Sequence, residues 1–515
     1  MKSRPLFALL ALAALLALAA GCGGGSSGGS KVAELAPPGA PVFVEGTVQP
    51  TGELKSNADA IAMQVAGIDN LGEYVAEKLE ASAKGEGEPF DYATEVEPWL
   101  GERAGLFWES GDTDESNLIV ESTDTEATQK FIDKQAEESN DPYRSRSYEG
   151  VDYVFGGGDE SAVGVVGDFL VATEGEQHFK DVVDASQGDS LAAEDTFAKA
   201  ISAASDGSLA DVYVDVGKLI EQSGGQIDPT ARQILQNAGI DPSEATAVAS
   251  VVPGSEEVTI DLSSDLAGEE APTGDASALL GSLPGNAFAG FAVSGFGQQL
   301  KQAIDSLDEE GIPDAVPPHQ LKKGLKELGI DLEGVADSLQ DAGVFAVGAN
   351  ENSLGGALVL STKGSQATNT IANLGLLLRN AHVAGVTALN GKYSGFSIRS
   401  DELGNKPLVV AAKEGRISIG YGLAPTLNGL VTEAGKGKTL AENPAYSDAV
   451  ASLGDTPIAG FADGPAALRL ADALIPSSDE GFEEAKKYLK SIRFLALGTA
   501  TQGELATAKL IVGVK

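Results

Sequence analysis

The chain has 515 residues and a formal net charge of −41 at pH 7, because 76 acidic residues outnumber 35 basic ones. This acidic excess argues against nucleic-acid binding, since proteins that bind DNA or RNA replace the counterions of the phosphates with Lys and Arg side chains. It also argues against attachment to a membrane through a basic patch. The length exceeds what one ordinary hydrophobic core accommodates and predicts at least two domains.

Residues 1–21 have the pattern of a bacterial lipoprotein signal peptide. Lys2 and Arg4 precede an apolar stretch over residues 6–20, which is shorter than the ~20 residues that a membrane-spanning helix needs. Residues 18–22 (Leu-Ala-Ala-Gly-Cys) resemble the lipobox, in which the cysteine is lipidated and becomes the new terminus. The leucine lies one position further from the cysteine than in the usual lipobox.

Two other outcomes compete with lipidation. Residues 17–19 (Ala-Leu-Ala) also fit an ordinary signal-peptidase site, which would release a soluble protein, and the segment could stay uncleaved as an anchor. Cys22 is the only cysteine of the chain and stands where lipidation needs it, which favours the lipoprotein. We therefore expect Cys22 to hold the protein on the extracytoplasmic face of the cell membrane. Residues 22–31, rich in Gly and Ser, are expected to form a flexible tether.

Beyond the tether, the same series of short patterns occurs twice in the same order. The most evident pairs of segments are 38–44 and 284–291, 104–107 and 342–345, and 210–215 and 459–463. We interpret residues 32–270 and 271–515 as two tandem copies of one domain. Residues 266–278, with two Glu, a Pro and a Gly, are the expected linker.

Apolar residues at helical spacing and short alternating runs bounded by glycine predict the elements of both copies. In the first copy we expect helices around 61–68, 76–79, 125–138 and 174–185, and strands over 104–109, 117–121, 143–155, 162–166 and 169–173. In the second copy we expect helices near 300–307, 321–328, 365–384, 424–434 and 479–490, and strands over 343–348, 356–361, 393–399, 407–412, 416–421, 493–498 and 505–514. Strands joined through hairpins, with helices returning on one face, predict an α+β fold with a mainly antiparallel sheet.

Two further segments strengthen the view of an exported protein. Residues 35–43 (Leu-Ala-Pro-Pro-Gly-Ala-Pro-Val-Phe) and 96–101 (Val-Glu-Pro-Trp-Leu-Gly), together with the lipobox, resemble a family of exported proteins of actinobacteria and their relatives. This family is catalogued as domain of unknown function three-three-five-two. The resemblance covers the whole mature chain and implies a cell-envelope setting without an activity. The second copy departs from the pattern at Ser338, where the first copy has Trp99.

Two motifs that could carry chemistry are incomplete. Residues 435–439 (Gly-Lys-Gly-Lys-Thr) resemble the end of a phosphate-binding P-loop, but Thr432 stands where that loop needs its first glycine. Asp112, Asp114 and Ser116 have the spacing that begins a calcium loop, but the turn glycine and the closing glutamate are missing. We interpret both as surface loops, while adventitious calcium binding by so acidic a chain stays open.

The histidines and the carboxylates single out no catalytic group. His178, His319 and His382 lie in different predicted elements and have neither metal-ligand spacing nor triad partners. Among 76 acidic residues no pair can be chosen as the carboxylates of a hydrolase. We therefore expect no cofactor, no metal site and no enzymatic activity.

Trp99 and Trp108 are the two tryptophans of the chain, and their counterparts in the second copy are Ser338 and Ala346. Filling of the first core is the favoured interpretation; the alternative is an aromatic patch that binds a ligand. The expected function is a non-enzymatic binding or scaffolding lipoprotein, with an unknown envelope protein or an apolar ligand as its partner. A lipid carrier and a carboxylate-dependent hydrolase are the alternatives. A carrier should contain a continuous apolar cavity, whereas a scaffold should show an exposed apolar patch.

Overall fold

The computed structural model describes residues 30–515 except for 87–88, 110–115, 140–141, 157–159, 223–242, 244, 266–273, 312–316, 328, 390–392, 405, 414, 432–437 and 503–504. The predicted signal peptide, Cys22 and most of the tether lie outside these residues. So do Asp112, Asp114 and most of the expected linker. None of the described helices is long and apolar enough to cross a membrane.

The chain divides into two compact units. Unit 1 comprises Met1–Glu270 with Thr501–Ala508 and Val514, and unit 2 comprises Ala271–Ala500 with Lys509–Gly513 and Lys515. Strand β20, the last of the chain, is thereby shared between the two units. Each unit is described by itself below.

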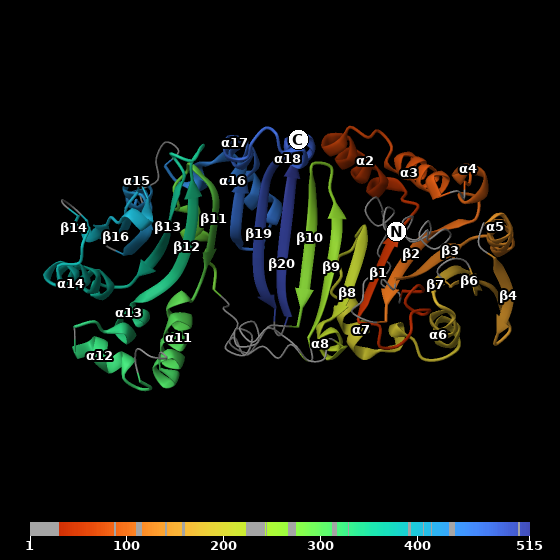
Figure 1. Ribbon diagram of the computed structural model, residues 1–515, viewed down its shortest axis with the longest axis horizontal. Coiled ribbons are helices and arrows are strands. Elements are labelled where there is room, and N and C mark those ends of the chain that lie inside the picture. The colour runs from red at the N-terminus through yellow and green to blue at the C-terminus, as the bar shows by residue number, and fades with distance from the viewer. Residues whose placement is uncertain are drawn as a thin grey trace. The chain divides into compact units, whose positions relative to one another are not determined.

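Unit 1 is built on one antiparallel sheet with the strand order β4-β5-β6-β7-β3-β2-β1-β8-β9-β10. Its elements appear from red to yellow-green in Figure 1. They are β1 (Val42–Thr47), α2 (Gly52–Ala66), α3 (Leu71–Glu86), α4 (Tyr92–Glu95), β2 (Leu100–Trp108), β3 (Asn117–Ser122), α5 (Thr125–Glu138), β4 (Tyr143–Tyr148), β5 (Val151–Gly156), β6 (Ser161–Val166), β7 (Phe169–Glu174), α6 (Glu176–Gln187), η1 (Leu191–Ala193), α7 (Asp195–Ile201), β8 (Ala210–Asp215), α8 (Val216–Gln222), β9 (Thr246–Pro253) and β10 (Glu257–Ser264).

Unit 2 has the strand order β14-β15-β16-β17-β13-β12-β11-β18-β19, again antiparallel, with β20 beside β19. Its elements, from green to blue in Figure 1, are α10 (Ser277–Gly281), β11 (Ala287–Val293), α11 (Phe296–Glu310), α12 (Leu321–Glu327), α13 (Leu332–Ser338), β12 (Leu339–Val347), β13 (Gly355–Thr362), α14 (Gln366–Asn380), β14 (Val386–Ala388), β15 (Ser394–Ile398), η2 (Asp401–Leu403), β16 (Leu408–Lys413), β17 (Arg416–Tyr421), α15 (Leu423–Asn428), η3 (Leu440–Glu442), α16 (Pro444–Leu453), β18 (Ile458–Asp463), α17 (Gly464–Leu474), α18 (Glu480–Leu489), β19 (Ile492–Gln502) and β20 (Leu505–Val514). The predicted α+β class with a mainly antiparallel sheet is confirmed.

The two units share their strand order, element by element. One backbone hydrogen bond outside the sheets also has a counterpart in the other unit. The backbone N–H of Leu191 in η1 donates to Ala36 O at 2.9 Å, and that of Leu440 in η3 donates to Leu283 O at 2.8 Å. The tandem duplication expected from the sequence stays a prediction.

Both faces of the sheet in unit 1 are buried, which corrects the expectation that helices return on one face. Successive strand residues point to opposite faces, and the central strands are apolar at successive positions. Phe107 therefore packs with Phe179 of α6 in one hydrophobic cluster. The preceding Leu106 packs with Phe131 and Ile132 of α5 in another.

Two strand predictions also differ from the structure. The single strand expected over 143–155 is a hairpin, because Glu149 and Gly150 take positive φ values of 47° and 85° and turn the chain between β4 and β5. Strands β9 and β10 were not predicted. In β9 the buried positions include Thr246 and Ser250, and Ser250 Oγ donates to Asp211 Oδ1 at 2.6 Å. These two polar residues lie on either side of the buried Val248 and interrupt the hydrophobic alternation on which strand prediction relies.

The N-terminus of α5 offers a test of this description, because Asp124 Oδ1 accepts the backbone N–H of Ala127 at 3.0 Å and caps the helix. We expect Asp124→Ala to lower the free energy of unfolding of unit 1 by about 1 kcal/mol, the usual value of such a cap. Denaturant unfolding followed by tryptophan fluorescence reports on this unit, since both tryptophans belong to it. Glu126→Ala, which removes only an exposed ion pair with Lys130, is the control and should change little. Equal effects of the two variants would contradict the assignment of the cap.

Candidate functional site

Trp99 lies between α4 and β2 and belongs to the core of unit 1. Its side chain is 2% exposed, and its ring centroid lies 5.7 Å from that of Phe131 in α5. The indole Nε1 donates a hydrogen bond to the Glu95 carbonyl at 2.6 Å. Trp108, at the far end of β2, is half-buried and packs against the same hydrophobic cluster. Of the two predicted ligand-binding aromatics, only Trp108 therefore presents part of its surface to solvent.

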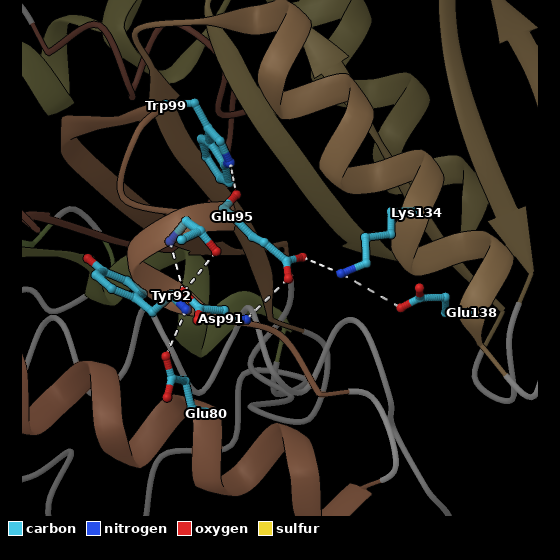
Figure 2. A network of polar contacts seen from close by, with 8 residues as sticks. Glu80, Asp91, Tyr92, Glu95, Trp99, Lys134 and Glu138 are labelled. Carbon is cyan, nitrogen blue, oxygen red and sulfur yellow. Dashed lines mark hydrogen bonds and ion pairs between the residues drawn. The ribbon is translucent and has the colours of Figure 1, made fainter.

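Polar side chains beside the indole connect α3, α4 and α5 (Figure 2). Glu95 Oε2 accepts from Lys134 Nζ at 2.6 Å, and Glu95 Oε1 accepts the backbone N–H of Asp91 at 3.3 Å. The hydrogen bond from Lys134 to Glu95 raises the pKa of the Lys134 ammonium. The backbone N–H of Tyr92 donates to Glu80 Oε1 at 2.8 Å. These bonds fix the short helix α4 in place, and we interpret the network as structural support for the buried indole.

The structure separates most of the other residues considered from the sequence. His319 and His382 are exposed in unit 2, whereas His178 is half-buried in α6 of unit 1. There its Nδ1 lies 2.9 Å from Glu109 Oε1. In the loop that resembles a P-loop, residues 432–437 lie outside the described residues. Thr439, at the end of the motif, is buried, and its Oγ1 donates a hydrogen bond to Glu442 Oε1 at 3.1 Å. That bond ties Thr439 to the first turn of η3.

One face of the sheet in unit 2 carries an exposed row of apolar side chains. The strand registers place Leu358, Val344, Phe291, Gly460 and Leu497 directly opposite one another on five neighbouring strands. Residues paired in this way point to the same face of a sheet. Phe291 is 41% exposed and Val344 is 45% exposed, while Leu358 and Leu497 are half-buried. We call these five residues the apolar row.

The equivalent row in unit 1 is more buried than the apolar row. Leu118, Leu106, Val44 and Val212 are paired across the equivalent strands; both leucines are fully buried and both valines are half-buried. In unit 2, Gly460 stands where unit 1 has Val212, and a Cβ atom there would lie within 3.3 Å of the neighbouring side chains in the row. The glycine thus leaves room for larger side chains on either side of it. The sequence has Phe and Val among small residues in β11 and β12, but which of these side chains are exposed depends on the tertiary packing.

A polar cavity of about 610 Å³ in unit 2 is lined in part by Ser338, the counterpart of Trp99. Ser338 takes the place of Trp99, since its carbonyl accepts the backbone N–H of Lys363 at 2.7 Å just as that of Trp99 accepts Thr123 at 2.8 Å. The cavity lies against α13 and α14 and is lined by polar side chains, among them Asp331, Asp337, Lys363, Gln366, Asn369 and Asn373.

A smaller cavity of about 340 Å³ lies between the end of β14, β15 and α15 in unit 2. Its walls include Leu389, Leu423 and Leu427, with the side chains of Ser397 and Arg399 at the same cavity. An apolar wall with a few polar groups is the usual composition of a small-molecule site.

Comparison with known proteins adds a family but no activity. The family model described as "Protein of unknown function (DUF3352)" matches residues 7–510. No curated protein matches the chain. Among solved structures, crystal form I of TP0453 is 11% identical, with 47% of this chain and 81% of that chain covered and a TM-score of 0.25. Crystal form III of TP0453 is 9% identical, with 78% and 98% covered and a TM-score of 0.17. Likeness at these TM-scores defines no common fold.

The placement of Trp99 generates a prediction about stability. Trp99→Ala removes a buried aromatic side chain and its hydrogen bond, and we expect it to lower the free energy of unfolding of unit 1 by about 3–5 kcal/mol. Trp108→Ala, at a half-buried position at the end of β2, should cost clearly less. Denaturant unfolding is followed by the fluorescence of whichever tryptophan remains. A Trp99→Ala protein as stable as the wild type would show that the indole is not a core side chain.

Proposed function

The chain belongs to the family of proteins of unknown function (DUF3352), and on that premise we propose that it is a membrane-anchored lipoprotein of an actinobacterial-type cell envelope. In this proposal a lipid on Cys22 holds the protein on the extracytoplasmic face, and the folded units bind or scaffold another component without catalysing a reaction. The observation that carries the binding role is the apolar row of unit 2.

The sequence before the folded units supports the anchor. Cys22 follows an apolar segment and a small residue, as the lipobox requires, and residues 23–30 contain only Gly and Ser. Val32 and Ala33, immediately beyond this segment, are fully buried in unit 1. A flexible tether that begins at the lipid would therefore end where the folded core begins.

The apolar row supports the binding role because exposed apolar surface is costly in water. Burial of a Phe or Val side chain contributes roughly 1.5–3 kcal/mol, and several such residues lie side by side in the row. The rest of the chain is strongly acidic, so repulsion between copies opposes self-association. An exposed apolar strip on such a protein is typical of a surface that another molecule covers.

The smaller cavity favours a second candidate function, the carriage of an apolar ligand. Leu389, Leu423 and Leu427 provide an apolar wall, and the Arg399 guanidinium could pair with an anionic group. An amphipathic molecule with a short apolar part fits this combination. The two candidate functions differ in what accompanies the purified protein: a scaffold retains another protein, and a carrier retains a small molecule.

The anchor is tested by replacing its single attachment point. Cys22→Ser should abolish the incorporation of labelled fatty acid into the protein and move it from the membrane fraction to the soluble fraction. The chain has no other cysteine, so residual labelling cannot come from a second thiol. Unchanged labelling or unchanged membrane association of the variant would overturn the proposed anchor.

The binding role is tested with the full chain extracted from its own membrane in mild detergent and measured by native mass spectrometry. We expect an additional mass on the wild-type protein and its loss in Phe291→Asp, because a charge in the apolar row opposes the burial of that surface. Leu376→Asp is the matched control, since Leu376 is 50% exposed in the same unit but lies on α14. Additional mass that extracts into organic solvent identifies a carrier. An unaccompanied wild-type chain, or equal losses in both variants, would contradict a binding role for the row.

A further inference from the structure

The polar cavity of unit 2 is walled by hydrogen-bonding groups. Its volume of about 610 Å³ lies within the range of roughly 300–1,000 Å³ that small-molecule sites occupy. Every residue that lines it is polar or a glycine, and helices α13 and α14 supply most of the lining. A lipid would therefore find no apolar wall there, in contrast to the smaller cavity beside Leu423.

One face of α14 forms part of the wall, with Gln366, Asn369, Thr370 and Asn373. They are three and four residues apart, and residues with this spacing share one face of a helix. The three amide side chains are exposed, and each carries two N–H donors and a carbonyl acceptor. Gln366 Nε2 donates to Asp331 Oδ2 at 3.3 Å, whereas no residue that the structure describes bonds to the amides of Asn369 and Asn373. Both amides can therefore bond to a molecule in the cavity.

The charged groups of the cavity are balanced. Asp337 Oδ1 accepts from Lys301 Nζ at 2.8 Å, and Asp331 Oδ1 accepts the backbone N–H of Gly334 at 3.3 Å. Lys363, also at the cavity, pairs with no carboxylate of the described residues. The two carboxylates of the lining are thus matched by two ammonium groups, in a chain whose net charge is −41. A balanced lining complements a neutral ligand better than an ion.

The corresponding face of α5 in unit 1 is charged and bonds to itself. The matching backbone bonds of Lys363 and Thr123 align the two helices: Gln366 with Glu126, Asn369 with Gln129, Thr370 with Lys130 and Asn373 with Asp133. In α5, Lys130 Nζ donates to Glu126 Oε1 at 2.8 Å, and Gln129 Nε2 donates to Asp133 Oδ1 at 2.9 Å. Unit 2 therefore has uncharged hydrogen-bonding side chains at these four positions, and it has them beside the cavity.

We propose that this cavity binds a neutral carbohydrate, with the amides of Asn369 and Asn373 as its main contacts. A hydroxyl group both donates and accepts hydrogen bonds, so each hydroxyl of a sugar can bond to an amide N–H and to an amide carbonyl or a carboxylate. An anion would be repelled by Asp331 and Asp337, and an apolar molecule would leave the polar wall without partners. The site is separate from the apolar row and goes beyond the binding role proposed for that surface.

The test is isothermal titration calorimetry of four neutral trisaccharides (maltotriose, cellotriose, mannotriose and chitotriose) into the purified full chain, kept in a detergent without a sugar headgroup. We expect saturable binding of at least one of them, with one molecule per chain. The affinity should fall about fivefold or more in Asn369→Ala and in Asn373→Ala, because each change removes a hydrogen bond to the ligand. Alanine favours a helix more than asparagine does, so the loss does not come from unfolding of α14.

Two matched controls should bind as the wild type does. Asn380→Ala removes an exposed amide at the end of the same helix, outside the cavity lining, and Gln129→Ala removes the corresponding amide of α5 in unit 1. The proposal is overturned if none of the four trisaccharides binds, or if Asn369→Ala and Asn373→Ala bind as tightly as these controls. Tighter binding of the acidic trisaccharide trigalacturonate would assign the cavity to an anionic ligand and would also overturn it.

Discussion

Both units depend on the alternation of side chains along the strands at the centre of the sheet. In unit 1, Phe107 faces one core and Leu106 the other, so each central strand supplies two layers of packing at once. A shift of register by one residue would exchange these layers and place each side chain against the wrong partners. The helices are therefore positioned by the sheet: α6 on the side of Phe107 and α5 on the side of Leu106.

The same registers in unit 2 produce a different surface from equivalent positions. Val344 and Phe291 are paired as Leu106 and Val44 are paired, but the row in unit 2 stays open. Ser338, the counterpart of Trp99, likewise lines a polar cavity in unit 2. We infer that unit 2, and not unit 1, presents the surface on which the proposed binding role rests.

The sequence predicted much of the fold because much of it is encoded locally. The helix over 125–138 forms with those bounds, since Asp124 caps its first turn and its apolar residues recur at helical spacing. Repetition along the chain also matched segments such as 104–107 and 342–345, which lie in β2 and β12 at the same place in the strand order of each unit. The prediction failed at β9, where buried Thr246 and Ser250 lie on either side of Val248 and bond to other side chains.

The candidate sites were harder to predict than the fold because they depend on side chains that meet only in the folded units. Nothing in the local sequence shows that Val344 is exposed while Leu106 is fully buried. The polar cavity likewise requires α13 and α14 to pack together. Residues 1–29 lie outside the described structure, so the proposed anchor rests on the sequence alone.

The claim that the apolar row of unit 2 is a binding surface is tested most directly by site-specific photocrosslinking in the native envelope. A photoreactive phenylalanine analogue is placed at Phe291 and, in a separate protein, at Val44, the equivalent position of unit 1. The account predicts a discrete crosslinked product from position 291 and none from position 44. Equal crosslinking at the two positions, or none at either, would contradict it.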